Sequence, residues 1–151
     1  MAHTYTTIRL HLVFSTLGRK PLIPPDLQPR LWDYIGGIGK NHHIPVHAVG
    51  GVENHVHVLL SLPPTIPLSK AAQTIKAYSS KWINETGLRR GTRFAWQEGY
   101  SAFSVSQSSM PKVEAYIGSQ AEHHHRHSFE DELRSLLARH GVQFDERFVF
   151  G

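Results

Sequence analysis

Two histidines, His55 and His57, stand one residue apart in an apolar run that has the composition of a buried β-strand. Side chains alternate between the two faces of a strand, so both imidazoles project from the same face. The valines and leucines that alternate with them share the opposite face. Imidazole is the commonest metal ligand in proteins, and two imidazoles on one rigid strand can supply half of a metal site.

Tyr116 and Gln120 could complete such a site. They are four residues apart in a predicted helix and therefore lie on one face of it, one turn apart. A tyrosine hydroxyl becomes a nucleophile only when a base or a cation offsets its pKa of about 10. If this helix faces the histidine strand, the two histidines and Gln120 would hold a divalent ion. Tyr116 would then be placed to attack a phosphate that the ion polarises.

Each of these features has a simpler interpretation when taken alone. A His-x-His pair on a strand is more often structural than metal-binding, and a helical tyrosine usually packs in a core or on the surface. The histidine-rich run over residues 123–127 could also bind metal. Consecutive residues of a helix point in different directions, however, so a fortuitous or solvated cluster is the better interpretation of that run.

The apolar periodicity predicts an α+β fold. Alternation at period two predicts strands over residues 6–14, 46–49, 55–62 and 102–106. Apolar residues at helical spacing predict helices that begin near residues 26, 68, 110 and 128. The resulting order, β-α-β-β-α-β with two helices appended, is that of the ferredoxin-like split βαβ fold. We expect an antiparallel sheet with helices on one face plus C-terminal helices, and the other face free for a ligand or a second subunit.

Composition indicates one globular domain over residues 1–151. Hydrophobic residues make up 40% and charged residues 19% of the chain, which excludes a disordered protein. The absence of cysteine excludes disulfides and thiolate metal sites and favours a reducing compartment. No signal peptide is recognisable, and no apolar run reaches the roughly 20 residues that cross a bilayer. We therefore expect a cytoplasmic protein without a membrane partner.

The charge balance favours a polyanionic partner. The chain has 16 Lys and Arg against 12 Asp and Glu, a formal net charge of +4. The basic residues gather between Lys70 and Trp96, where Glu85 is the one acid and aromatic side chains could stack on bases. The positions assigned to nucleic-acid contact are Lys76, Lys81, Arg89, Arg90 and Arg93. The alternative is a solvated helix face with the aromatic rings in the core, and Trp82 fits that alternative better.

An ordered set of segments covers nearly the whole chain and is much more specific than the histidine pair alone. The segments are 11–16, 50–51, 55–60, 76–82, 94–106, 116–120 and 122–124. Together they resemble the single-tyrosine HUH transposases of the IS200/IS605 type, a group that includes the REP-associated tyrosine transposases. One position departs from the family pattern, since Asn54 stands before the first histidine where relatives often have an acidic residue.

The resemblance implies a role for each site residue. His55 and His57 match the metal-binding histidines, Gln120 matches the third ligand, and Tyr116 matches the nucleophile. In this family the tyrosine attacks single-stranded DNA, forms a 5′-phosphotyrosine link and frees a 3′-OH, and the reverse attack rejoins the strand without an external energy source.

The resemblance also implies partners. The ion is Mg²⁺ or Mn²⁺, and the DNA carries imperfect hairpins near the ends of a mobile element. The family works as homodimers, often with the tyrosine helix of one subunit completing the site of the other.

Two other interpretations of the sequence compete with that of a DNA transposase. A histidine-triad nucleotide hydrolase needs a third histidine two residues after His57, and Leu59 stands there. A domesticated relative could bind hairpin DNA or RNA without cutting it, but a pure binder need not keep both histidines, the tyrosine and the glutamine. We therefore expect an enzyme, a metal-dependent nickase and strand transferase.

Overall fold

A four-stranded antiparallel sheet forms the centre of the computed structural model, which describes residues 3–86 and 93–151. The strands are β1 (Arg9–Ser15), β2 (Val46–Val52), β3 (His55–Ser61) and β4 (Ser101–Ser104), and they lie in the order β2-β3-β1-β4. β2 and β3 form a hairpin with Glu53 and Asn54 at the turn, and β3 lies between β1 and β2. This is the split βαβ arrangement, so the predicted fold class is confirmed.

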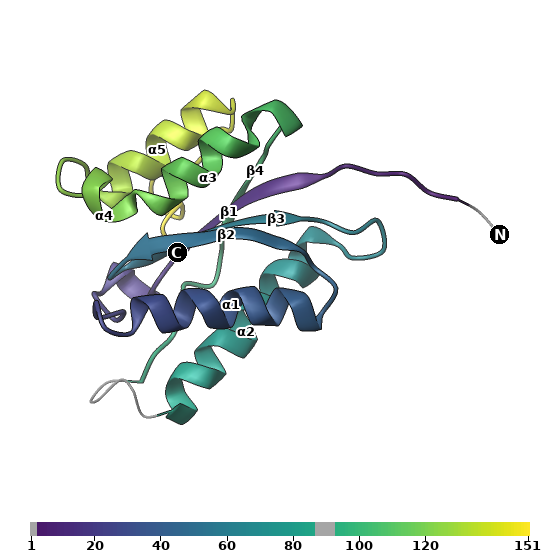
Figure 1. Cartoon of the computed structure of the whole chain (residues 1–151). Helices are drawn as coiled ribbons and strands as arrows, with labels where there is room; N and C mark the ends of the chain where they lie inside the picture. The colour runs from purple at the N-terminus through teal and green to yellow at the C-terminus, as the bar shows by residue number, and fades with distance from the viewer. Residues whose placement is uncertain (1–2, 87–92) are drawn as a thin grey trace.

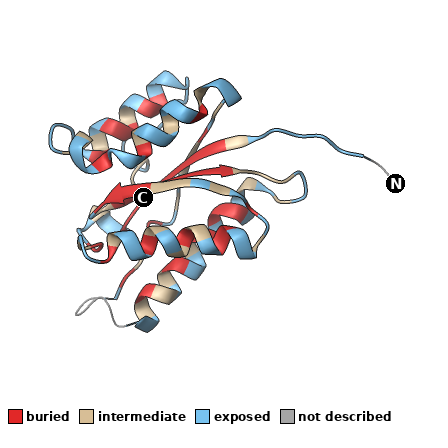
Figure 2. Ribbon diagram, in the orientation of Figure 1, coloured by how far each residue is buried: buried red, intermediate tan, exposed pale blue. Residues whose placement is uncertain are grey.

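Helices α1 (Gln28–Asn41) and α2 (Leu68–Thr86) cover one face of the sheet (Figure 1). Alternate residues of β1 and β3, among them Leu12, Phe14 and Val58, point to this face and have no exposed surface. They pack against the apolar stripes of both helices in the main core. Figure 2 shows how completely the central strands are buried.

The opposite face of the sheet is covered as well, by α3 (Met110–Gly118), α4 (Gln120–His123) and α5 (Phe129–Arg139) (Figure 1). The expectation that this face would be free is wrong. Val13 and Leu59 point toward this face and seed two smaller apolar clusters, one with α5 and one with α3. Val13 and Leu59 therefore give the C-terminal helices an apolar surface on which to bury their own stripes, beside the buried His55 and His57 of the same face.

The C-terminal residues fasten α5 to the rest of the molecule. Phe150 packs against the α5 cluster, and the guanidinium of Arg19 lies 4.7 Å from the centre of its ring. Arg19 also forms an ion pair of 2.9 Å with Glu130 of α5, and Gln97 donates a hydrogen bond of 2.7 Å to the carbonyl of Gly151. These contacts hold α5 over the histidine strand. Within the described part of the chain, no helix is both long enough and apolar enough to span a membrane.

Candidate active site

The histidine pair of β3 lies on the face that α3, α4 and α5 cover. His55 and His57 are fully buried, with their ring centres 5.0 Å apart. The Nε2 atoms of both rings face one carboxylate oxygen, Oε1 of Glu132, at 3.3 and 3.1 Å. Glu132 comes from α5 and is itself buried. The sequence therefore places the two imidazoles correctly, but the acid that joins them was missed.

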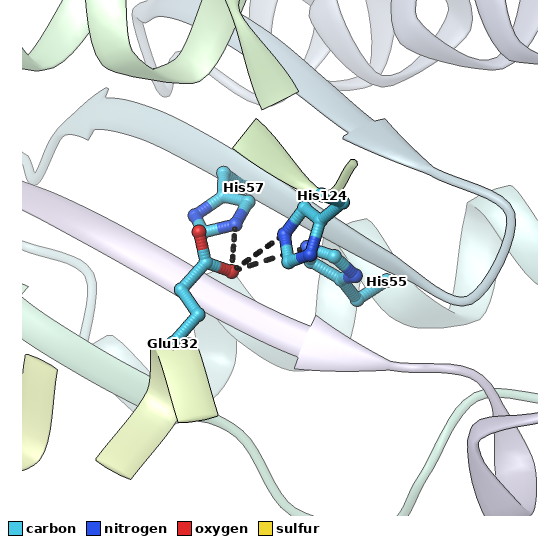
Figure 3. A group of neighbouring side chains, drawn as sticks. All are labelled: His55, His57, His124 and Glu132. Carbon is cyan, nitrogen blue, oxygen red and sulfur yellow. Dashed lines mark hydrogen bonds and ion pairs between the residues drawn. The ribbon is translucent and has the colours of Figure 1, made fainter. Parts of the chain in front are cut away.

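Two further side chains from the start of α4 and just beyond it point into the same place. Gln120 Oε1 lies 3.1 Å from His55 Nε2 and 2.9 Å from His124 Nε2. His124 Nε2 also lies 3.2 Å from Glu132 Oε1, and Figure 3 shows the three imidazoles converging on that carboxylate. The interpretation of the histidine run as a solvated cluster is therefore wrong for His124, although His125 and His127 are exposed as expected.

The spacing of these atoms fits a metal ion. Ligand atoms of His55, His57, His124 and Glu132 all lie within 4.8 Å of one another. When nitrogen and oxygen ligands sit 2.0–2.2 Å from an ion, neighbouring ligand atoms are about 3 Å apart. The close pairs in this group, Gln120 included, are separated by 2.9 to 3.3 Å. The set of imidazole, carboxylate and amide donors therefore suits a divalent cation.

Each strand histidine has a second partner that can fix its tautomer. Asn54 Oδ1 lies 2.8 Å from His55 Nδ1, and His11 Nε2 lies 2.7 Å from His57 Nδ1. In the tautomer in which Nδ1–H donates to these acceptors, the Nε2 lone pair of each ring is free to bind an ion, whereas in the other tautomer Nε2–H donates to Glu132. The amide at position 54 thus orients the ring of His55.

Burial keeps the imidazoles of His11 and His55 neutral, and the neutral form is the one in which His55 could bind a metal. Burial, helped by the nearby His57, lowers the pKa of His11 to about 3. Burial also lowers the pKa of His55 to about 4, although the hydrogen bond to Glu132 acts in the opposite direction. Both rings are therefore neutral at neutral pH.

Glu132 also holds the hydroxyl of Tyr116. The tyrosine donates a short hydrogen bond to Oε2 of Glu132, and its ring centre lies 5.8 Å from that of His57. Burial and then the Glu132 carboxylate raise the pKa of Tyr116 well above its ordinary value. Burial alone would raise the pKa of Glu132, but hydrogen bonds from His124, His55 and His57 hold it far below its usual range. One ionised carboxylate therefore connects the candidate nucleophile to the candidate metal ligands.

Comparison with known proteins then assigns the chain. Residues 4–120, well over half of the sequence, match the model of the family described as "Transposase IS200 like". The chain belongs to the IS200-like transposase family. The predicted resemblance is confirmed, and the histidine pair, Tyr116 and Gln120 all lie within the matched residues. Glu132 and His124 lie beyond them; segment 122–124 is part of the resemblance, but the resemblance assigns no role to His124, and Glu132 is not part of it.

Solved structures share the fold of this IS200-like family member. A structure from Deinococcus radiodurans that is assigned as a transposase has 18% sequence identity and a TM-score of 0.63, and the match covers 80% of this chain and 95% of that one. A REP-associated tyrosine transposase bound to a REP hairpin has 14% identity and a TM-score of 0.55, over 79% of this chain and 70% of that one. Among curated proteins, none matches the chain.

Tyr116 and Gln120 belong to two short helices instead of one. In this family member α3 ends at Gly118, and Gln120 begins α4. The side-chain amide of Gln120 still lies 3.4 Å from the backbone carbonyl oxygen of Tyr116, so the two residues remain neighbours across the break. α3 also approaches β2 closely, since a Cβ atom at Gly50 would lie 2.2 Å from the carbonyl oxygen of Ile117.

Gly50→Ala is expected to lower the free energy of unfolding by about 1–3 kcal/mol, because the added methyl group would push α3 away from β2. Urea denaturation measures this difference. Gly37→Ala is the matched control, since nothing lies within 4 Å of the new Cβ and alanine favours a helix. If Gly50→Ala unfolds at the same urea concentration as the parent protein, the close packing of α3 on β2 does not stabilise the position of the tyrosine helix.

Of the five predicted basic residues, the three that the structure describes lie apart from this site. Lys76 is on α2, across the sheet, where its ammonium donates to the carbonyls of Glu98 and Gly99 at 2.9 Å. Arg93 lines the same surface cavity as Lys76. Lys81 is exposed and lies 3.9 Å from Glu85. Arg89 and Arg90 lie outside the described residues. Trp82 stacks on Tyr34 with ring centres 4.5 Å apart, in agreement with the core interpretation of that residue.

Proposed function

We propose that the protein is a transposase that cuts and rejoins single-stranded DNA through a 5′-phosphotyrosine link to Tyr116. One observation carries this proposal, namely that Glu132 contacts the tyrosine hydroxyl with one oxygen and three candidate ligand histidines with the other. A nucleophile and a metal-ligand set therefore share one buried carboxylate. The family assignment agrees with this reading of the site.

The proposed metal ligands are His55, His57, His124, Gln120 and Glu132. A bound divalent cation, Mg²⁺ or Mn²⁺, would polarise a non-bridging phosphate oxygen and stabilise the charge that develops in the transition state. We favour Mn²⁺, because Mg²⁺ prefers oxygen ligands and keeps several waters, whereas this set includes three imidazole nitrogens.

Tyr116 would act as the nucleophile. Its oxygen forms a bond to the phosphorus, the bond from phosphorus to the 3′ oxygen breaks, and the departing 3′ oxygen takes up a proton. Because burial raises the pKa of the phenol, the tyrosine proton has to leave as the new bond forms. Glu132 Oε2 already accepts the hydrogen bond from this hydroxyl and is the positioned acceptor. Attack of a 3′-OH on the phosphotyrosine reverses the step and rejoins the strand.

Hairpin DNA is the proposed partner. Support comes from the hairpin-bound REP-associated transposase that shares the fold, and from the net charge of +4. Incubation with Mn²⁺ and end-labelled oligonucleotides, made from the hairpins that flank the gene, tests the proposal on a denaturing gel. The expected result is a covalent adduct that carries the 3′ fragment, with a free 3′-OH on the other fragment. A domesticated binder would shift the same hairpins on a native gel and form no adduct.

Mn²⁺ is expected to stabilise the protein against heat. An ion present at 100 times its dissociation constant would add about 2.7 kcal/mol to the free energy of unfolding. Differential scanning fluorimetry should show a rise in melting temperature that EDTA reverses. His57→Ala should lose this rise, whereas the exposed His47→Ala, whose ring bonds to Ser61, should keep it. Equal rises in both variants would place the ion elsewhere.

A homodimer is proposed from the family, with a complete site in each subunit. The support for this arrangement is that Tyr116 and His57 lie side by side within one chain. A mixture of Tyr116→Phe and His57→Ala proteins, unfolded and refolded together, should therefore form no more adduct than either variant alone. Recovery of adduct would indicate that the tyrosine helix of one subunit completes the site of its neighbour.

A further inference from the structure

A cavity of about 560 Å³ lies beside Tyr116, between β4, α3 and α5. Its volume is within the range of about 300–1,000 Å³ that is typical of sites for small organic molecules. We propose that this cavity binds one nucleotide of the single-stranded DNA that flanks the phosphate attacked by Tyr116. The inference rests on the proposed function of the tyrosine.

The charge of the cavity suits a nucleic acid strand. Lys112 and Arg139 line it, and none of the described residues in its wall is acidic. A second, smaller cavity of about 240 Å³ also borders Tyr116 and Arg139, but Asp131 and Glu132 line that one. Because a phosphate chain is repelled by carboxylates, the strand should enter the cavity that contains Lys112.

The inner wall of the cavity can receive a base. Phe103 is buried there, and the ring of His140 packs against it at 4.6 Å between centres. Leu136 and Val113 add aliphatic surface, and Ser106 adds a hydroxyl that could bond to a base edge. Stacking on such planar side chains is worth about 1–3 kcal/mol per base. The cationic rim would contact the phosphate of a nucleotide, and the apolar, aromatic wall would contact its base.

The position of the cavity connects it to the reaction. Tyr116 and His11 both line it, and His11 bonds to His57 at 2.7 Å. A phosphate that reaches the tyrosine hydroxyl would therefore bring its neighbouring nucleotide to the cavity. The residues that line it from α5 lie beyond the segment shared with the family model, which ends at residue 120. The cavity is thus built partly from residues that lie outside the matched segment.

The test measures binding in the Tyr116→Phe background, where no covalent link can form. The probes are fluorescent thymidine, adenosine and cytidine deoxy-oligomers of about 12 nucleotides and an abasic oligomer with the same phosphates. Anisotropy should show that at least one oligomer with bases binds about fivefold or more tightly than the abasic one. Adding Ser106→Trp, which fills the cavity, should remove this preference. Ser108→Trp is the matched control, because Ser108 is exposed and does not line the cavity.

Charge variants provide the second arm. Arg139→Ala should weaken binding of all the oligomers, and Lys40→Ala, on α1 across the sheet, should not. The proposal is overturned if no oligomer binds more tightly than the abasic probe, or if Ser106→Trp keeps the preference. These outcomes are separate from the failure of the proposed function, which would appear as the absence of any adduct between the wild type and hairpin DNA.

Discussion

Tyr116→Phe is expected to reduce covalent attachment to DNA by at least about a thousandfold, because it removes only the oxygen that forms the bond to phosphorus. The phenylalanine ring keeps the packing against His11 and His57, so the fold and the affinity for hairpin DNA should remain. A denaturing gel measures the adduct, and a native gel measures hairpin binding.

Tyr78→Phe serves as the control for the loss of a phenol. Tyr78 is exposed on α2, across the sheet from the candidate site, and its variant should form as much adduct as the parent. Undiminished adduct in Tyr116→Phe would remove the tyrosine from the mechanism. Loss of hairpin binding together with adduct would indicate a structural role for the ring.

Glu132→Gln has the second largest expected effect. The substitution keeps the shape of the side chain but removes the negative charge that contacts His55, His57 and His124. Loss of such a partner usually lowers metal affinity by about 10- to 100-fold, and we expect Mn²⁺ affinity to fall at least that far. Adduct formation should fall at least as much, because the tyrosine hydroxyl also loses its charged acceptor.

Isothermal titration with Mn²⁺ measures the role of Glu132 in metal binding separately from its role as the acceptor of the tyrosine proton. Glu114→Gln is the matched control, because Glu114 is an exposed acid on α3, two residues from Tyr116. Hairpin affinity should be unchanged in both variants, since phosphate contacts elsewhere supply most of it. Parental Mn²⁺ affinity and adduct formation in Glu132→Gln would mean that the carboxylate has no part in the site.

The periodicity of side chains within a single strand or helix predicted those parts of the site that come from one such element. The period of two in β3 fixes His55 and His57 on one face, and this holds wherever the strand lies. The hairpin, the two main helices and the split βαβ order also follow from short-range periodicity. Whether the second face of the sheet is covered depends on how helices that are distant in the sequence pack against it. Short-range periodicity does not determine this packing, so the expectation of a free face was wrong.

The sequence nevertheless indicates that Glu132 is buried. It lies on the same side of its helix as Phe129, Leu133 and Leu136, and a carboxylate on an apolar stripe must find a buried partner. The sequence also points to His124, because it follows Gln120 by four residues and so shares a helical face with a residue already assigned to the site. The sequence does not give the position of α5. It therefore could not show whether Glu132 and His124 contact the histidines of β3 or solvent.

Mass spectrometry of the DNA adduct identifies the residue that is joined to the phosphate. Nuclease trimming of the adduct, followed by trypsin, should leave a nucleotide phosphate on the peptide spanning residues 113–126, where Tyr116 is the sole tyrosine. We expect that modification at Tyr116, in a reaction that requires Mn²⁺ and is lost in His57→Ala. A nucleotide phosphate on any other residue, or an unmodified 113–126 peptide in a preparation that has cleaved hairpin DNA, would contradict this expectation.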